Sequence, residues 1–283
     1  MEAIYRVMDA LLPFALFRYS FMKNALLALL FLTPLLALLG TMAVNKRMAF
    51  FSDALGHSAL AGVGIGVLLG VSNITLILVV FGICWALLIT RINRTGGEAS
   101  DTTISVFSSA GIALGLLVLS GSGKYGKYSS ILVGDILAVT PTDILCLGIA
   151  LAVGVLLWVL MYNQLLLTAI NPQLAQSRGI RDKAVEYGFV ILVAVAVMLS
   201  IRWVGVLLIN ALLILPAAAA RNVSRSAAQH ALISVLISLF SGVAGLCVSV
   251  PLGTSVGAAV VLCAAVCYAL SLLVSRVFRI KLQ

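Results

Sequence analysis

Charged residues are scarce in this chain, and their scarcity is the first indication of its class. Only 10% of the 283 residues are Asp, Glu, Lys or Arg, whereas a soluble domain carries roughly 25%. Acidic residues are the rarer sign, with 9 Asp and Glu against 18 Lys and Arg. Because 63% of the residues are hydrophobic and the mean hydropathy is +1.20, the sequence predicts an all-α protein that crosses a membrane many times.

Cysteine and histidine are also few, which argues against disulfide, haem and zinc-protease chemistry. The five cysteines are odd in number and scattered through apolar stretches, which argues against a disulfide framework. Cys263 and Cys267 share a helix face and could bind a soft metal, but we favour buried apolar side chains. The two histidines, His57 and His230, are expected at different depths, which argues against a haem anchor. Ser-Ala-Leu-Ala follows His57, so the His-Glu-x-x-His pattern of an intramembrane zinc protease is absent.

Long apolar runs indicate roughly eight to nine transmembrane helices. A hydrocarbon core of about 30 Å requires about 20 residues of helix. Suitable runs lie at residues 25–44, 54–71, 74–92, 103–121, 143–162, 184–201, 203–220, 228–250 and 255–275. The loops between them are short, so we expect one permease-like domain over residues 1–283 with no soluble part. An energy source or soluble receptor would then belong to another chain.

The net charge of +9 raises the possibility of nucleic acid, but the distribution of basic residues indicates a membrane instead. If the 46–47 loop is cytoplasmic, alternation along nine spans places twelve basic residues inside and six outside. The inner set is Lys46, Arg47, Arg91, Arg94, Arg178, Arg181, Lys183, Arg221, Arg225, Arg276, Arg279 and Lys281. This bias fits the positive-inside rule, with the N-terminus outside and the C-terminus in the cytoplasm. Residues 1–23 predict an interfacial segment, and no cleavable signal peptide is evident.

Asp53 and His57 are the candidate functional residues within this apolar chain. They are four residues apart and so share one helix face. At 1.5 Å per residue, His57 lies about 15 Å beyond Arg47, near the middle of the hydrocarbon core. Ionisable groups at such depth are costly and are usually functional. A carboxylate oxygen and an imidazole nitrogen are ligands for zinc or manganese, so the pair predicts a metal site on a pathway-lining helix.

Each residue of the pair also has a simpler interpretation. Asp53 could cap the start of its helix, and His57 could be a buried histidine bonded to a neighbouring helix. Two ligands also leave the site incomplete, because zinc usually takes four. A two-fold dimer would supply a second pair, or other groups of the same chain or water would complete the shell. An incomplete site suits a carrier, since an ion held too tightly does not leave.

Small and polar residues predict how the helices pack. A ridge of small residues, which would let a second helix approach closely, consists of Ser58, Gly62, Gly66 and Gly70. Pro216 removes a helical hydrogen bond and predicts a kink in the seventh span. Asn210, one to two turns earlier, either bonds helices together or lines the path, and we favour the first role.

Residues 167–181 form a predicted cytoplasmic loop that contains a short helix. Asn171 is a suitable N-cap, Pro172 suits the first helical position, and Gly179 is a C-terminal stop. The residues that could pack into a groove on a partner are Leu174 and Ala175. A solvated connector is the simpler alternative, but connectors seldom carry both a start and a stop signal.

Four motifs occur in one order along the chain. They are Asn-Lys-Arg-Met-Ala-Phe-Phe-Ser-Asp-Ala-Leu-Gly-His-Ser-Ala-Leu at 45–60, Leu-Val-Gly-Asp-Ile-Leu-Ala-Val-Thr-Pro at 132–141, the 171–179 loop, and Gly-Val-Leu-Leu-Ile-Asn-Ala-Leu-Leu-Ile-Leu-Pro-Ala-Ala-Ala-Ala-Arg at 205–221. The second segment contains Gly-Asp-Ile-Leu-Ala-Val-Thr-Pro at 134–141. Together they resemble the integral-membrane permease of the ABC-3 family, which serves zinc and manganese importers. The resemblance extends from about residue 25 to 275. One departure is the stretch before the Pro251-Leu-Gly253 turn, which lacks the acidic residue that family members often carry.

The resemblance implies a permease dimer in the bacterial inner membrane, two cytoplasmic ATPase subunits and an external metal-binding protein. ATP would be hydrolysed on the partner subunits, so the chain would be no enzyme and would hold no permanent cofactor. The coupling contact to the ATPase would comprise Asn171, Pro172, Leu174, Ala175 and Gly179. Asp53 and His57 match the family's Asp-x-x-x-His positions, which are implicated in metal passage.

The resemblance also favours zinc as the cargo, because the 134–141 motif looks more like that of zinc importers. Manganese or iron carried by a permease of the same family is the alternative. A self-contained secondary carrier driven by a proton gradient is a second alternative. The bounded helix of the 167–181 loop argues against that carrier, since a carrier needs no ATPase.

Overall fold

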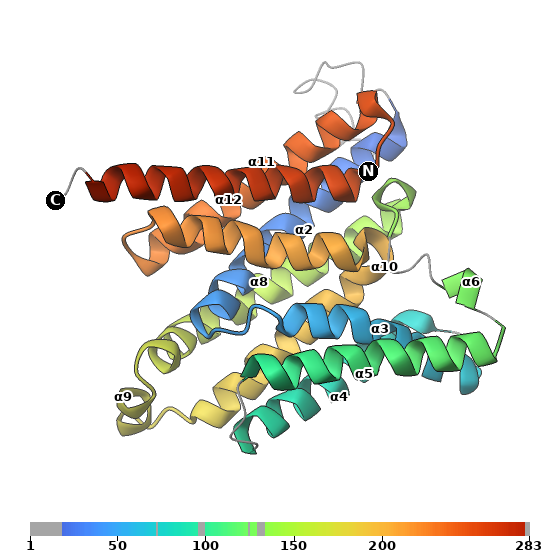
Figure 1. The fold of residues 1–283 in the computed structure, drawn as a ribbon, viewed down its shortest axis with the longest axis horizontal. Coiled ribbons are helices and arrows are strands. Elements are labelled where there is room, and N and C mark those ends of the chain that lie inside the picture. Colours follow the sequence, from blue (N-terminus) through green and yellow to red (C-terminus); the bar gives the residue numbers. More distant parts are fainter. Residues whose placement is uncertain (1–18, 72, 96–99, 124, 129–133, 281–283) are drawn as a thin grey trace. The chain divides into compact units, whose positions relative to one another are not determined.

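The structure is a computed structural model that describes residues 19–71, 73–95, 100–123, 125–128 and 134–280. The regular elements of these residues are all helices (Figure 1). They are α2 (Ser20–Asn45), α3 (Phe51–Leu68), α4 (Ile74–Thr95), α5 (Ser100–Gly121), α6 (Tyr125–Tyr128), the 3-10 turn η2 (Ile136–Ala138), α8 (Pro141–Ile170), α9 (Pro172–Ser177), α10 (Asp182–Val223), α11 (Ala227–Leu252) and α12 (Val256–Ile280). The predicted interfacial segment 1–23 lies mostly outside the described residues.

Eight helices of the described part of the chain are long and apolar enough to cross a membrane: α2, α3, α4, α5, α8, α10, α11 and α12. Large apolar side chains remain exposed along them, as at Leu145, Ile149, Leu156 and Leu160 of α8. Such a surface is unfavourable in water but suits the lipid tails of a bilayer. A helix can cross the bilayer because its backbone groups form hydrogen bonds with one another. The predicted class, an all-α protein with many membrane spans, is therefore confirmed.

The 42-residue helix α10 joins two spans that the sequence predicts separately. The sequence places the boundary at Arg202, but the backbone leaves helical geometry at Gly205, where φ is 77° and ψ is 162°. Only glycine adopts such a φ readily. At 1.5 Å per residue α10 would extend about 63 Å, twice the hydrocarbon thickness, so its two segments correspond to the two predicted spans. The helix keeps helical geometry at Pro216, where a kink stays a prediction.

Gly134 explains part of the second family motif. Its φ is 66°, and a Cβ added there would lie 2.1 Å from the backbone nitrogen of Gly205. Two glycines therefore bring the backbone at Gly134, the first residue of Gly-Asp-Ile-Leu-Ala-Val-Thr-Pro, against the break in α10. A side chain at Gly134 would force these backbones apart.

The described chain divides into two compact units, each built from segments far apart in sequence. Unit 1 takes in the described residues of Met1–Thr41, Asp135–Val153 and Ala211–Gln283, and unit 2 those of Met42–Gly134 and Gly154–Asn210. The helices α2, α8 and α10 each belong partly to both units. The prediction of a single permease domain over residues 1–283 stays a prediction.

Unit 1 is held together by small and hydroxyl side chains. Ser238 of α11 donates a hydrogen bond to the Thr33 carbonyl of α2 (3.0 Å). A Cβ at Gly245 of α11 would lie 2.5 Å from Val260 Cα of α12, so these helices touch at their backbones. Gly253, with φ 60°, ends α11 just after Pro251, as the predicted turn requires.

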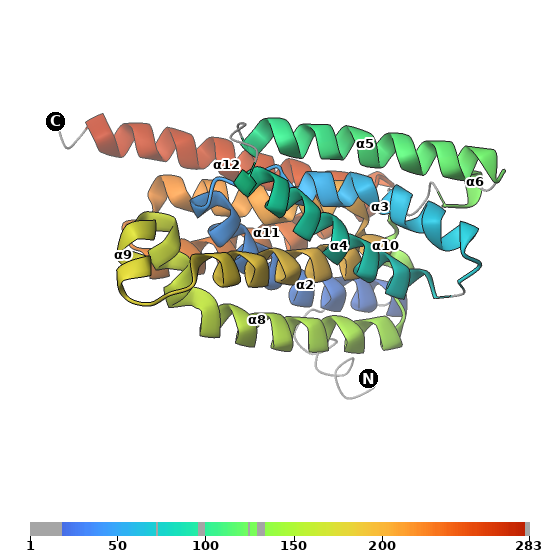
Figure 2. The ribbon, with the colours of Figure 1, turned by 90° about the horizontal axis from the view of Figure 1, so that it is seen from below.

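In unit 2, α3 lies between α4 and α5 (Figure 2). A Cβ at Gly62 would lie 2.9 Å from Phe81 Cδ1, and one at Gly66 would lie 2.6 Å from Ile77 Cδ1, both on α4. These two glycines form the predicted close contact. Gly70 takes no part in it, because no atom in the described part of the chain lies within 4 Å of its Cβ position. Its φ of 65° belongs to the turn that follows α3.

The other side of α3 is held by glycines of α5. A Cβ at Gly111 would lie 2.6 Å from Ser58 Cβ, and one at Gly115 would lie 2.5 Å from Leu60 Cβ. These two glycines were not predicted from the sequence to form a helix contact. Helix α3 is thus fixed on both sides, which leaves one face for Asp53 and His57.

Candidate metal-passage site

The start of α3 brings Asp53 and His57 together. Asp53 Oδ1 lies 3.4 Å from His57 Nε2, and the side chains are 43% and 38% exposed. All the remaining residues from Phe51 to Gly64 are buried. The predicted pair is therefore the open part of an otherwise buried stretch of helix. A half-exposed carboxylate and imidazole on one face are able to contact a hydrated cation.

The simpler interpretations of the pair do not fit this geometry. Phe50 is the N-cap of α3 and makes no side-chain capping bond, while Asp53 lies in the first turn. The polar contacts of the Asp53 carboxylate are with His57 and Asn210 rather than with backbone N–H groups. His57 is half-exposed, and its partner lies on its own helix. The positive end of the α3 dipole also complements the negative charge of Asp53.

Asn210 of α10 is a third polar residue at the site. Its Nδ2 donates a hydrogen bond of 2.7 Å to Asp53 Oδ1. The bond is possible because α3 and α10 lie very close: a Cβ at Gly56 would sit 2.5 Å from Val206 Cγ1. Asn210 thus bonds two helices, as the sequence predicts, and does so through the carboxylate of the candidate site.

The ligand set offered by one chain remains small. Among the residues that the structure describes, no group of three or more His, Cys, Asp or Glu side chains is arranged to hold a metal ion. The site presents one carboxylate, one imidazole and the Asn210 carboxamide. The remaining ligands of a metal in transit would come from water or from a second copy of the chain.

His230, the other histidine, has a structural role. Its side chain is 5% exposed, and its Nε2–H donates a hydrogen bond of 2.9 Å to the Ala217 carbonyl. This agrees with the prediction that His230 packs or bonds rather than binding a metal. With Nε2 engaged, it is not available as an axial ligand to haem. All five cysteines are free thiols. The expectation that Cys263 and Cys267 are buried is wrong, because both are partly exposed.

The loop helix α9 begins and ends where the sequence predicts. Asn171 Oδ1 accepts a hydrogen bond of 3.0 Å from the Leu174 backbone, and Pro172 is the first helical residue. Gly179, with φ 75°, donates its N–H to the Gln176 carbonyl (2.9 Å), and Ile180 donates to Ala175 (3.0 Å). These two bonds form a Schellman motif. Helix α8, however, continues to Ile170, past its predicted end at residue 162.

The two residues expected to contact a partner differ in exposure. Leu174 is 42% exposed, whereas Ala175 is 0% exposed and is buried within the chain. Ala175 lies at the third position from the C-terminal end of α9, where its carbonyl accepts the Ile180 bond. Only Leu174 of this pair is therefore available to another protein.

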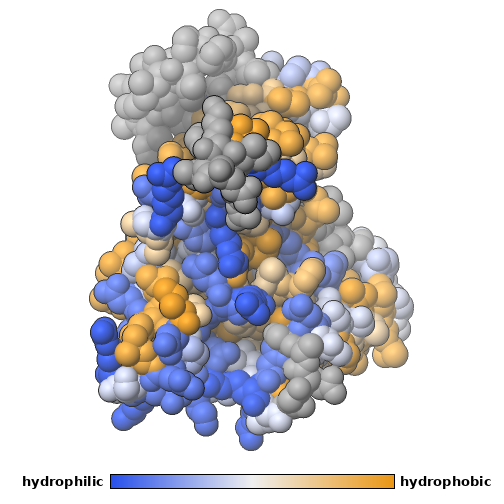
Figure 3. All heavy atoms as spheres, turned by 60° about the vertical axis from the view of Figure 1, so that its left-hand side comes forward, coloured by the Kyte–Doolittle hydropathy of each residue, from blue (hydrophilic) through white to orange (hydrophobic). Residues whose placement is uncertain are grey.

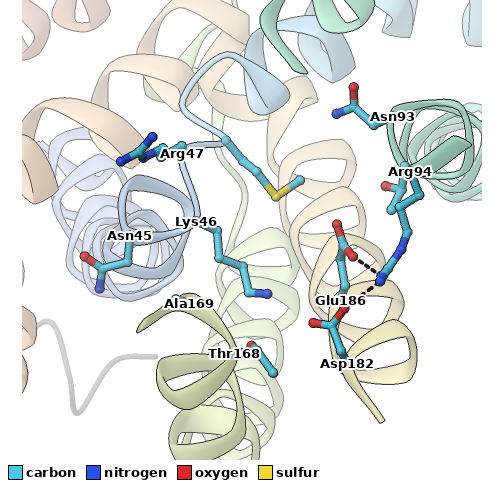
Figure 4. Close-up of a pocket in the computed structure, with 11 residues that line it drawn as sticks. Asn45, Lys46, Arg47, Asn93, Arg94, Thr168, Ala169, Asp182 and Glu186 are labelled. Atoms are coloured by element: carbon cyan, nitrogen blue, oxygen red, sulfur yellow. Dashed lines mark hydrogen bonds and ion pairs between the residues drawn. The ribbon is translucent and has the colours of Figure 1, made fainter. Parts of the chain in front are cut away.

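A polar pocket of about 450 Å³ lies where α10 follows the α9 loop (Figure 4). Arg94 of α4 bonds to Asp182 (Nη2 to Oδ2, 2.5 Å) and also to Glu186, both on the first turns of α10. The Lys46 ammonium points toward the two carboxylates. Burial lowers the pKa of Lys46, although Glu186 and Asp182 partly counter that effect. Figure 3 shows hydrophilic side chains gathered mainly in the lower half of the face that it draws, with hydrophobic side chains beside them.

This ion cluster was not predicted from the sequence. Its signal is the spacing of Asp182 and Glu186, four residues apart at the start of a predicted span. Nothing in the sequence names Arg94, 88 residues earlier, as their partner. The cluster joins α4 to the segment that directly follows the predicted coupling loop.

The chain matches the model of the ABC 3 transport family over residues 18–275. It is 32% identical to the high-affinity zinc uptake system membrane protein ZnuB of Haemophilus influenzae, over 90% of this chain and 97% of that protein. It is also 32% identical to the manganese import system permease protein ScaB of Streptococcus parasanguinis, over 91% and 92%. Among solved structures, PsaBC from Streptococcus pneumoniae in complex with Fab matches with a TM-score of 0.79 at 28% identity, over 96% of this chain and 95% of that one.

The fold and these similarities define a multi-pass transport permease of the bacterial inner membrane, which is not itself an enzyme. The chain belongs to the ABC 3 transport family. The resemblance first indicated by the four motifs is thereby confirmed over almost the whole sequence.

Proposed function

We propose that the chain is the membrane subunit of an ATP-driven importer of a divalent metal ion, with zinc as the first choice and manganese as the alternative. The observation that carries the proposal is the half-exposed Asp53–His57 pair on an otherwise buried stretch of α3. Carboxylate and imidazole suit both ions. The names of the relatives, a zinc uptake protein and a manganese import permease, support the same two cargoes.

The proposal requires partners. Two copies of the chain form a dimer and contribute one Asp53–His57 pair each, which supplies ligands that one chain lacks. Two cytoplasmic ATPase subunits hydrolyse ATP, and an external binding protein delivers the metal. The small ligand set of a single chain and the membership of the ABC 3 transport family support this assembly.

Coupling to ATP hydrolysis occurs through α9. The exposed side chain of Leu174 docks on the ATPase, while the buried Ala175 anchors α9 to the permease. A movement of α9 is passed to the first turns of α10, which the ion cluster of Arg94, Asp182 and Glu186 ties to α4. In this way a nucleotide-driven change in the cytoplasm reaches helices of the passage.

The experiment that tests the function is ATPase activity and metal uptake by the complete transporter in liposomes. The external binding protein is loaded with zinc in one series and with manganese in the other. We expect uptake in the zinc series, lost in Asp53→Ala and His57→Ala although both variants still assemble with the ATPase. Asp101→Ala, which removes an exposed carboxylate from the first turn of another spanning helix, α5, is the control and should transport normally.

Normal uptake by both site variants would contradict the proposed path. Uptake stimulated only by the manganese-loaded protein would show that manganese, not zinc, is the transported ion. Proton-driven uptake by liposomes that hold this chain alone would contradict ATP-driven transport and support a secondary carrier.

A further inference from the structure

The Asp53 carboxylate is bonded on one side only. Its Oδ1 receives the Asn210 Nδ2–H at 2.7 Å and lies 3.4 Å from His57 Nε2. Both contacts therefore converge on the same oxygen. The other oxygen, Oδ2, has no polar partner among the residues that the structure describes and is open to a cation that approaches from the exposed side.

Only one of the two polar atoms of the Asn210 side chain, Nδ2, has a hydrogen-bond partner among the described residues. Its Oδ1 is buried and has no hydrogen-bond partner among the described residues. A buried carbonyl without a partner is unfavourable, and native structures contain few of them. Such an atom next to a candidate cation site points to a ligand that is bound for part of the time.

The carboxamide is able to serve two states of the site. Its nitrogen is a donor and its oxygen an acceptor, and a half-turn about the Cβ–Cγ bond exchanges them within the same volume. When the site holds no ion, the N–H group complements the negative Asp53. When a cation binds Asp53, it repels that N–H group and attracts the carboxamide oxygen.

We propose that Asn210 is a further ligand of the metal in transit, which holds Asp53 through Nδ2 in the ion-free state and turns its Oδ1 to the ion when the ion binds. The inference rests on the proposed function of the Asp53–His57 pair. It gives each chain two oxygen ligands and one nitrogen ligand. Oxygen ligands suit manganese, and the imidazole suits zinc, so this set accepts either ion.

The position of Asn210 follows from the break in α10. Gly205 starts a new helical segment five residues before Asn210, and Gly56 lets this segment approach α3 between the two ligand residues. The amide therefore reaches Asp53 from a second helix rather than from α3 itself. A ligand shared between α3 and α10 also links ion binding to the contact between these helices.

The test measures the affinity of the complete transporter, without its external binding protein, for zinc and for manganese added as free ions. Asn210→Leu keeps the branched shape of the side chain but removes both the donor and the oxygen, and we expect its affinity to fall about ten- to a hundredfold. Asn210→Asp removes the donor but places a second carboxylate beside Asp53, and we expect its affinity to equal or exceed that of the wild type. Asn210→Ala replaces the leucine variant if that variant does not assemble.

A matched control separates metal binding from helix packing. Asn222, also on α10, donates a hydrogen bond of 2.9 Å to Ser271 of α12 and does not contact Asp53. Asn222→Leu should bind both ions like the wild type. If it loses affinity as strongly as Asn210→Leu, the loss reflects helix packing and the inference is overturned.

The remaining outcomes distinguish this inference from the proposed function. Wild-type affinity in Asn210→Leu, together with weak binding in Asp53→Asn, would overturn the role of Asn210 alone. Equally weak binding in Asn210→Asp and Asn210→Leu would mean that the oxygen is no ligand, and would also overturn it. Wild-type affinity in Asp53→Asn would instead refute the site on which both rest.

Discussion

At the scale of single residues, the site depends on Gly56, which has no side chain and so lets α10 approach α3 closely. Gly56 lies between Asp53 and His57 on α3, and its Cβ position is 2.5 Å from Val206 Cγ1. That close approach places Asn210 within hydrogen-bond distance of Asp53. A glycine with no chemistry of its own thus determines the geometry of the three polar residues.

Substitution of Gly56 should therefore disrupt the site from a distance. In Gly56→Ala, the new methyl group has to displace Val206, which overpacks the contact and costs about 1–3 kcal/mol. We expect a lower Tm of the transporter and weaker metal binding. The double variant with Val206→Ala, which removes the opposing methyl groups, should recover both properties.

Gly121→Ala is the control, since no atom of the described residues lies within 4 Å of that Cβ position. It should change neither Tm nor metal affinity. A Gly56→Ala variant that binds metal like the wild type would show that the α3–α10 approach does not position the ligands.

The lowered pKa of Lys46 predicts that the stability of the fold depends on pH. Burial lowers its pKa in the folded chain, so between the lowered value and 10.5 the unfolded chain binds more protons. Stability attributable to this group should therefore rise as the pH increases through that window. Lys46→Met removes the buried charge, so we expect a higher Tm at pH 7 and a smaller gain at alkaline pH. A thermal-unfolding series in detergent tests this, and a gain that grows with pH would contradict it.

At the scale of elements, the loop helix α9 shows what local sequence determines. Its first and last residues were predictable because Asn171, Pro172 and Gly179 act within a few residues of their own positions. The break in α10 was predicted at the wrong place, because apolar periodicity does not reveal a positive φ and Gly205 is one of many glycines. The bond from Asn210 to Asp53 joins residues 157 positions apart, and no local pattern predicts it.

The cap of α9 provides the element-scale prediction. Asn171→Ala removes the acceptor of the Leu174 N–H bond and should destabilise α9 by about 1 kcal/mol. If α9 couples the two subunits, the variant will hydrolyse more ATP for each metal ion transported. The measurement is the ratio of ATP hydrolysed to metal taken up by liposomes.

Asn73 provides the matched control for this cap. Its Oδ1 accepts a hydrogen bond of 3.2 Å from Leu76 N at the start of α4, far in sequence from the loop. Asn73→Ala also removes a helix cap but should leave the ratio unchanged. An equal effect of both substitutions, or no effect of Asn171→Ala, would count against the coupling role of α9.

At the scale of the whole molecule, the sequence determined class and family but not the composition of the units. Apolar runs and charge bias suffice for a multi-pass membrane protein, because the bilayer restricts the possible folds. The division into two units does not follow the chain, since α2, α8 and α10 each contribute to both. Such an arrangement depends on long-range packing, as at the Gly111 and Gly115 contacts with α3, which composition alone does not specify.

The central claim is that the metal ion in transit touches Asp53 and His57. The chain contains only two histidines, and His230 is buried and bonded to the Ala217 carbonyl. A permease labelled with ¹⁵N-histidine and assembled with unlabelled partners would therefore report the contact directly when Mn²⁺ is added. The magnetic coupling between Mn²⁺ and ¹⁵N in an electron–nuclear double resonance spectrum detects an imidazole nitrogen bound to the ion.

We expect a strong ¹⁵N coupling in the wild type and in His230→Gln, and its loss in His57→Gln. No ¹⁵N coupling in the wild type, or a coupling that persists in His57→Gln, would contradict the account.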